Sequence, residues 1–162
     1  MSIHAFIEIE KGSNIKYEWN KETESLEIDR VLPEPYVYPF AYGFIPGTYA
    51  EDGDELDILV LSDKPIPINT YLEVYIIGAM LMEDEKGNDE KILAVLPEDY
   101  LSGKIRDICD VPSQTTMEIQ SFFANYKINE PGKWSRVDGF VNREYAFQIY
   151  KGAIFIPKSH EW

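Results

Sequence analysis

The residue types behind several common chemistries are scarce in this sequence. The 162 residues include one cysteine, Cys109, and two histidines, His4 and His160. A single cysteine excludes an intrachain disulfide, and because no local pattern gives Cys109 a base, we expect a small buried or half-buried side chain. Both histidines lie near the chain ends, where we expect exposed side chains, and this disfavours a Ser-His-Asp triad. Glycine-rich nucleotide loops and the C-x-x-C and H-E-x-x-H motifs are absent as well.

Basic residues and long apolar runs are also few. The chain has 15 Lys and Arg against 29 Asp and Glu, which gives a net charge of −14. A protein that wraps nucleic acid needs a surplus of the opposite sign. The longest apolar runs, such as residues 76–82, are far shorter than the roughly 20 residues of a membrane span. Residues 1–4 do not begin a signal peptide. We therefore expect a cytoplasmic protein with no nucleic-acid and no membrane partner.

Short segments with alternating polarity dominate the first two thirds of the chain. Clusters of proline and glycine separate them, a pattern typical of a small barrel or sandwich. No linker, repeat or low-complexity segment divides the sequence, and its length suits a single domain, residues 1–162. The strands expected from alternation are residues 4–9, 15–19, 26–32, 56–61, 71–82 and 91–96.

One later segment has the spacing of an amphipathic helix. Ile119, Phe122, Phe123 and Tyr126 follow the i, i+3, i+4, i+7 pattern and therefore share one face. Ser113 is the expected N-cap, and the Pro-Gly pair at 131–132 excludes a continuation. A second helix is predicted over residues 142–150.

The strongest chemical signal is an acidic turn that leads into an apolar strand. Asp52 and Asp54 flank a glycine, and Asp57 shares a strand face with Leu59 and Leu61. A carboxylate in that position is costly to bury without a partner. Oxygen-only ligands suit Mg²⁺ or Mn²⁺, and Ca²⁺ less selectively. The alternative is a solvated acidic turn. A second acidic loop, residues 83–91, has the alternative interpretation of a plain hairpin tip.

In this order, the motifs resemble those of the family I soluble inorganic pyrophosphatases. Residues 52–58 satisfy every position of the seven-residue family signature, in which three aspartates frame a short turn. Further matching segments are residues 6–9, 15–18, 29–30, 38–46, 84–91, 122–127 and 132–134. The resemblance spans residues 6–141. It implies a mainly β (α+β) fold, a closed five-stranded OB-like β-barrel with flanking helices.

The resemblance also implies a role for each site residue. The function implied is Mg²⁺-dependent hydrolysis of pyrophosphate to two orthophosphates, by direct attack of a metal-bridged hydroxide. Mn²⁺ or Zn²⁺ are implied substitutes for Mg²⁺, and Ca²⁺ is expected to inhibit. Asp54 is the implied general base, and Asp57, Tyr42 and Arg30 complete the catalytic set. The implied metal ligands are Glu8, Glu18, Asp52, Asp57, Asp84 and Asp89, and the implied substrate-binding residues are Lys16, Arg30, Tyr42, Lys91, Tyr126 and Lys127.

The charges of these residues give a physical reason for metal dependence. Seven acidic side chains against four basic ones leave a formal charge of −3, which repels pyrophosphate unless divalent cations enter. Three alternatives are a catalytically inactive relative, an OB-type nucleic-acid binder and an acidic metal-buffering protein. The complete set of acids and bases disfavours the first, the net charge disfavours the second, and the third leaves the basic residues unexplained.

Two features depart from the family pattern and concern assembly. Bacterial members often carry histidines on the helix before Tyr126 that pack between the subunits of a hexamer, whereas Ser121 and Asn125 stand at those places here. The sequence after Val141 also differs from the pattern. We still expect a homo-oligomer, with a hexamer favoured.

Overall fold

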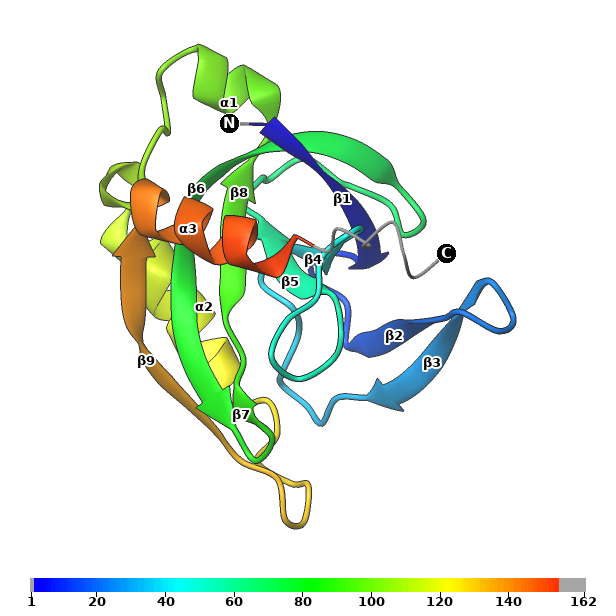
Figure 1. Cartoon of the computed structure of the whole chain (residues 1–162). Coiled ribbons are helices and arrows are strands. Elements are labelled where there is room, and N and C mark those ends of the chain that lie inside the picture. The colour runs from blue at the N-terminus through cyan, green and yellow to red at the C-terminus, as the bar shows by residue number, and fades with distance from the viewer. Residues whose placement is uncertain (1, 155–162) are drawn as a thin grey trace.

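Five strands pair in a closed ring at the centre of the protein (Figure 1). The computed structural model describes residues 2–154. Around the ring, the strands are β1 (Ser2–Ile9), β4 (Ala41–Ile45), β5 (Leu56–Val60), β8 (Lys91–Val95) and β6 (Tyr71–Asp84). Pairing of β1 with β6 closes the ring, and β5 and β8 form its one parallel pair. The prediction of a mainly β fold built on five closed strands is confirmed.

The ring strands are buried on both sides, which explains their apolar runs. On β5, Ile58 and Leu59 are both fully buried but belong to two different clusters of core residues. The Leu59 cluster includes Phe123 of helix α2 (Ser113–Asn125), and the Ile58 cluster includes Ala146 of helix α3 (Arg143–Ala153). In Figure 1, α3 lies in front of β6 and β8, and α2 lies behind them. Asp57 points to the α2 side, because strand side chains alternate.

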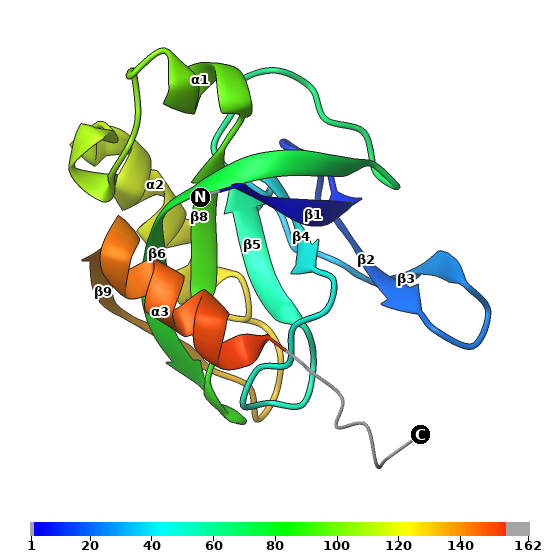
Figure 2. The same cartoon turned by 45° about the horizontal axis from the view of Figure 1, so that its top comes forward.

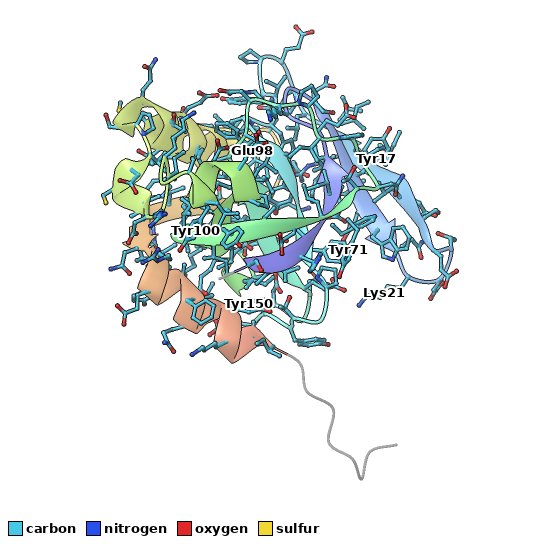
Figure 3. The ribbon with its side chains drawn as sticks, turned by 90° about the horizontal axis from the view of Figure 1, so that it is seen from above. Tyr17, Lys21, Tyr71, Glu98, Tyr100 and Tyr150 are labelled. Atoms are coloured by element: carbon cyan, nitrogen blue, oxygen red, sulfur yellow. The ribbon has the colours of Figure 1, made fainter. Side chains whose placement is uncertain are left out.

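A separate two-stranded sheet carries part of the pocket described below. Strands β2 (Ile15–Asn20) and β3 (Ser25–Val31) pair only with each other, and the hairpin extends away from the ring (Figure 2). Viewed from above, Lys21 lies at the hairpin and Tyr150 lies on α3 (Figure 3). An ion pair of 2.9 Å joins Lys21 to Glu55 in the acidic turn before β5. The hairpin is therefore joined to the acidic turn by this ion pair.

Both predicted helices are present, and one of their expected caps is wrong. The expected stripe on α2 is buried, and Asn142 begins α3 by accepting the Tyr145 N–H at 2.9 Å. The predicted N-cap Ser113 is wrong, because the carbonyl of Pro112 accepts the Thr115 N–H and Ser113 is already helical. The other helical segments are α1 (Pro97–Leu101) and the short 3₁₀ helix η1 (Ile108–Asp110). Within residues 2–154, none of the helices is long and apolar enough to cross a membrane.

Two ring or ring-edge strands were not predicted from alternation. These are β4, and β9 (Ser135–Asn142), which pairs along β6; the two-residue strand β7 (Gly87–Asn88) completes the sheet. The expectation for Cys109 is wrong, since the side chain is exposed. Cys109 lies in the short helix η1. His4 is exposed as predicted and stacks on Tyr71, whereas His160 lies outside the described residues.

Candidate active site

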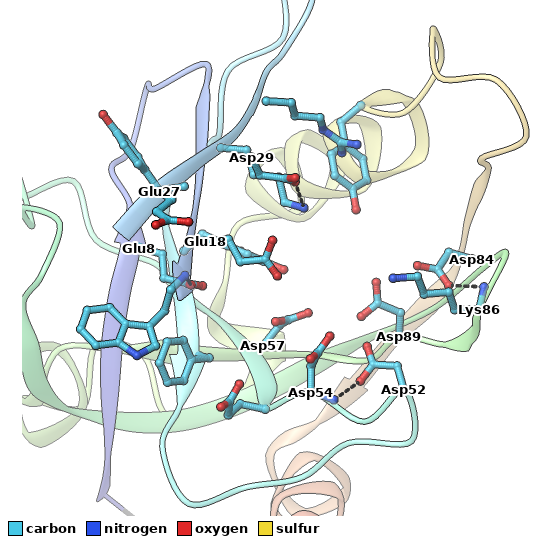
Figure 4. Close-up of a pocket in the computed structure, with 18 of the residues that line it drawn as sticks. Glu8, Glu18, Glu27, Asp29, Asp52, Asp54, Asp57, Asp84, Lys86 and Asp89 are labelled. Carbon is cyan, nitrogen blue, oxygen red and sulfur yellow. Dashed lines mark hydrogen bonds and ion pairs between the residues drawn. The ribbon is translucent and has the colours of Figure 1, made fainter. Parts of the chain in front are cut away.

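One cavity of about 820 Å³ gathers the predicted site residues. It lies between the β2–β3 hairpin and the ends of β5 and β8, beside the end of α2. Figure 4 shows carboxylates that approach it from both sides, with Glu8 and Glu18 opposite Asp52, Asp54 and Asp89. The lining includes Glu8, Lys16, Glu18, Arg30, Tyr42, Asp52, Asp54, Asp57, Asp84, Asp89, Lys91, Tyr126 and Lys127, which is the whole set implied by the resemblance.

A buried lysine forms the floor of this cavity. Lys91 is 2% exposed, and its ammonium donates to Asp57 at 2.6 Å, to Asp89 at 3.0 Å and to the Tyr42 hydroxyl at 2.9 Å. The parallel pairing of β5 and β8 brings this about, because Asp57 lies directly beside Lys91 in register. Burial opposes the charge on Lys91, but the two carboxylates outweigh it and hold its pKa well above the usual value.

The pKa values of the two acidic partners of Lys91 shift in opposite directions, although burial acts to raise both. Burial dominates for Asp57 and raises its pKa, although Lys91 works in the other direction. For Asp89, Lys91 outweighs burial and lowers the pKa. Burial also raises the pKa values of Tyr42 and Tyr126, so both phenols keep their protons near neutral pH and can donate hydrogen bonds. The floor thus combines anionic acceptors with neutral donors.

The acidic turn before β5 presents two carboxylates to the cavity. Asp52 accepts the N–H of Asp54 at 3.0 Å, and Gly53 between them adopts a φ of +89°, a conformation that favours glycine. The N–H of Ala50 also donates to the Asp54 carbonyl at 2.7 Å, which closes the turn. Burial raises the pKa of Asp52, whereas the Asp54 side chain is exposed at the cavity (Figure 4).

A third wall comes from the turn after β6 and the end of α2. Lys127 reaches Asp84 at 3.1 Å and Glu85 at 3.5 Å. The other oxygen of Asp84 accepts the backbone N–H of Lys86 at 2.9 Å. These contacts place a basic side chain and two acidic ones together at the cavity edge, within reach of an anionic ligand and its cations.

The hairpin side of the cavity also mixes both charges. Lys16 pairs with Asp29 at 2.9 Å, and Arg30 pairs with Glu130 from the turn that follows α2. Glu8 of β1 is 8% exposed, and burial raises its pKa to about 8, although the Trp19 N–H donates to it at 2.9 Å. Glu8 is therefore protonated near neutral pH unless a cation binds it.

Five carboxylates that line the cavity were assigned no role from the sequence: Glu22, Glu27, Asp29, Glu55 and Glu85. Glu85 stands within a matched motif, next to Asp84, and that adjacency is the only signal that could have drawn attention to it. Asp29 stands next to Arg30 in the same way. Glu130 is not among the lining residues but pairs with Arg30, and it has no local signal, since it is 100 residues from Arg30 along the chain.

The donor set fits a hard divalent cation. Carboxylate oxygens surround the cavity, and Mg²⁺ typically binds through one or two carboxylates while it keeps several waters. Among residues 2–154, no three His, Cys, Asp or Glu side chains are gathered closely enough to hold an ion as they stand. Lys91 provides the positive charge between Asp57 and Asp89 instead. The arrangement can thus accept cations together with an anionic ligand and can expose acids and bases to it.

Comparison with known proteins agrees with this chemistry. A family model described as inorganic pyrophosphatase matches residues 5–155. The chain is 46% identical over 154 residues to the inorganic pyrophosphatase of Thermus thermophilus, covering 94% of this chain and 88% of that protein. Identity to the Nanoarchaeum equitans inorganic pyrophosphatase is 44%, covering 94% and 96%. The solved Helicobacter pylori inorganic pyrophosphatase superimposes with a TM-score of 0.90 at 42% identity, covering 94% and 91%.

Proposed function

The chain belongs to the inorganic pyrophosphatase family and is a hydrolase of pyrophosphate, and from this premise we propose that it requires Mg²⁺ and cleaves by direct attack of water. The observation that carries the proposal is the convergence of all the implied site residues on one cavity. Both acidic and basic side chains line it, as a ligand made of phosphates and divalent cations requires.

The basic side chains bind and orient the phosphates. Arg30 and Lys16 approach from the hairpin, and Lys127 approaches from the end of α2. Charge-assisted hydrogen bonds from these groups offset the charge of the phosphates, most of all where it increases in the transition state. Tyr42 and Tyr126 add neutral O–H donors, because their raised pKa values keep them protonated.

The acidic side chains hold the cations and move the proton. Asp52, Asp57, Asp84 and Asp89 are the proposed direct ligands, with Glu8 and Glu18 acting from the opposite wall. When bound, the metal lowers the pKa of a coordinated water and offsets phosphate charge. Asp54 accepts the proton from the attacking water, since its carboxylate faces the cavity without an ion-pair partner among the described residues. No covalent bond to the protein forms.

Phosphate release from pyrophosphate, with and without millimolar Mg²⁺, tests the proposal. We expect turnover only with Mg²⁺, and a fall of about 10²–10⁴-fold in kcat for Asp54→Asn, which is the range of general base catalysis. The matched control is Asp138→Asn, which removes a carboxylate paired with Arg136 outside the cavity and should leave kcat unchanged. No release by the folded wild-type protein would contradict the proposal, as would equal rates for Asp54→Asn.

Assembly into a homo-oligomer, with a hexamer favoured, is a separate proposal. Ser121 is exposed on α2, and the Asn125 amide donates to the Ser121 carbonyl at 2.8 Å. Ser121 and Asn125 thus give α2 a small polar surface at the positions where bacterial members of the family often carry histidines. Light scattering coupled to gel filtration measures the mass directly, and a monomer at micromolar concentration would contradict the proposal.

A further inference from the structure

The Arg30 guanidinium is only partly used by the protein itself. One of its terminal nitrogens, Nη1, donates to Glu130. Nε and Nη2 are buried and have no hydrogen-bond partner among the described residues. The Tyr126 ring lies against the guanidinium, with its centroid 5.6 Å from Cζ. An arginine presents its N–H groups as a planar fork that matches two oxygens of a phosphate. Arg30 thus lines the cavity while two of its donors stay buried and unsatisfied.

Glu130 sits between two cations of the same cavity. Besides Arg30, its carboxylate lies 3.6 Å from the ammonium of Lys133, which also lines the cavity. The Glu130 side chain is 29% exposed and comes from the turn between α2 and β9. Its own N–H donates to the Lys127 carbonyl, and its carbonyl accepts the Lys133 N–H at 3.2 Å. The turn thus presents one carboxylate to Arg30 and Lys133. A bound phosphate oxygen would use the same two cations as partners.

We propose that Glu130 is an internal anion that holds Arg30 in the substrate-free protein, and that a substrate phosphate replaces it. The proposal rests on the proposed function, because it takes Arg30 to be a phosphate-binding residue. A phosphate carries more charge than a carboxylate, so it competes for Nη1, and the exchange would also uncover Nε and Nη2, which are buried and unsatisfied while Glu130 is in place. Glu130 is then a positioning residue that acts through Arg30.

The exchange has a defined thermodynamic consequence. A phosphate must displace Glu130 before it reaches Arg30. The apparent affinity is therefore the affinity of the open form multiplied by the fraction of molecules in which Arg30 is free of Glu130. The same competition helps the product phosphate to leave. A carboxylate that only orients Arg30 and stays in place would have the opposite effect, because its removal would weaken phosphate binding.

Binding of inorganic phosphate to the full-length protein with Mg²⁺, followed by titration calorimetry, separates the two roles. We expect Glu130→Gln to bind phosphate about tenfold more tightly, which corresponds to one charge-assisted hydrogen bond of about 1.4 kcal/mol. The KM for pyrophosphate should fall by a similar factor while kcat stays level or falls. Glu130→Asp retains the carboxylate and should lie nearer to wild type. Glu83→Gln, which breaks a surface pair with Arg136, is the control and should change neither quantity.

Each outcome decides the proposal. Unchanged or weaker affinity of Glu130→Gln for phosphate overturns the proposal. If Glu130→Asp also binds phosphate more weakly, the role of Glu130 is to orient Arg30. Glu130→Ala provides a second neutral variant in case glutamine forms a new hydrogen bond to Arg30. Failure of the proposed function is seen separately, as wild-type protein that binds phosphate but releases none from pyrophosphate.

Discussion

Replacing Lys91 by methionine should destabilise the protein, because Asp57 and Asp89 at the floor of the cavity would then repel each other. Lys91 is 2% exposed and lies within 3.0 Å of both Asp57 and Asp89. Methionine preserves most of the length of the side chain but leaves two carboxylates without their shared cation. Removing one partner of a buried ion pair costs about 3–5 kcal/mol. For a chain of this size, about 2–4 °C per kcal/mol gives a melting temperature lower by about 6–20 °C.

Thermal unfolding of the metal-free protein near neutral pH measures this loss. Mg²⁺ should raise the melting temperature of Lys91→Met by more than that of the wild type, because the ion replaces the missing positive charge. Lowering the pH should also narrow the difference, since protonation removes the repulsion between Asp57 and Asp89. Lys64→Met is the matched control, because Lys64 pairs with Glu98 on the surface and should leave the melting temperature unchanged. Equal melting temperatures for Lys91→Met and the wild type at neutral pH would refute the reasoning.

Three further predictions concern the acidic side chains and the cation. Asp57→Asn should nearly abolish phosphate release while circular dichroism shows a native fold, and full activity would contradict the assignment of Asp57. Because burial raises the pKa of Glu8 to about 8 from an ordinary value near 4.5, folded protein binds more protons than unfolded protein between those values. The free energy of unfolding without metal should therefore fall by a few kcal/mol as the pH rises through this window. Urea titrations should show a flatter profile for Glu8→Gln, and identical profiles would count against a neutral Glu8. Ca²⁺ should inhibit turnover measured in Mg²⁺, since it prefers longer bonds and more ligands; faster turnover in Ca²⁺ would contradict this.

Alternating and continuous apolar patterns predicted four of the five ring strands. The two strands they missed, β4 of the ring and β9 at its edge, have physical reasons for a weak pattern. Strands β1, β5, β6 and β8 carry alternating or continuous apolar runs, which their burial in the sheet requires. Strand β4 contains Gly43, whose Cα lies so close to the β1 backbone that a Cβ atom would be 1.8 Å from the Phe6 carbonyl oxygen. A strand that needs glycine for close approach has weak strand propensity, and alternation alone did not reveal it. Strand β9 carries charged residues on its exposed side and Gly139 in its interior, which weakened its pattern.

Motifs predicted which residues share the cavity, but they did not predict how those residues pair with one another. The resemblance implied a set of site residues, and the structure brings all of them to one cavity. The contact between Lys91 and Asp57 depends on the parallel pairing of β5 with β8, which no local pattern encodes. The contact between Arg30 and Glu130 joins a hairpin to a turn 100 residues away. Pairings of this kind follow from the tertiary fold, and sequence periodicity carries no information about them.

The separation of the β2–β3 hairpin from the ring has a consequence for how the protein loses activity. An isolated two-stranded hairpin is marginally stable in water, and this one shares no strand pairing with the ring. Its opening would break the ion pairs of Lys21 and Arg30 and the contacts of Trp19 with Glu8 and Phe6 of β1, but none of the ring's strand pairing. The hairpin is therefore a cooperative unit of its own, whose amide hydrogens should exchange before those of the ring. Heat or mild denaturant would then inactivate the enzyme while its barrel remains folded, and such inactivation would reverse as soon as the hairpin closes.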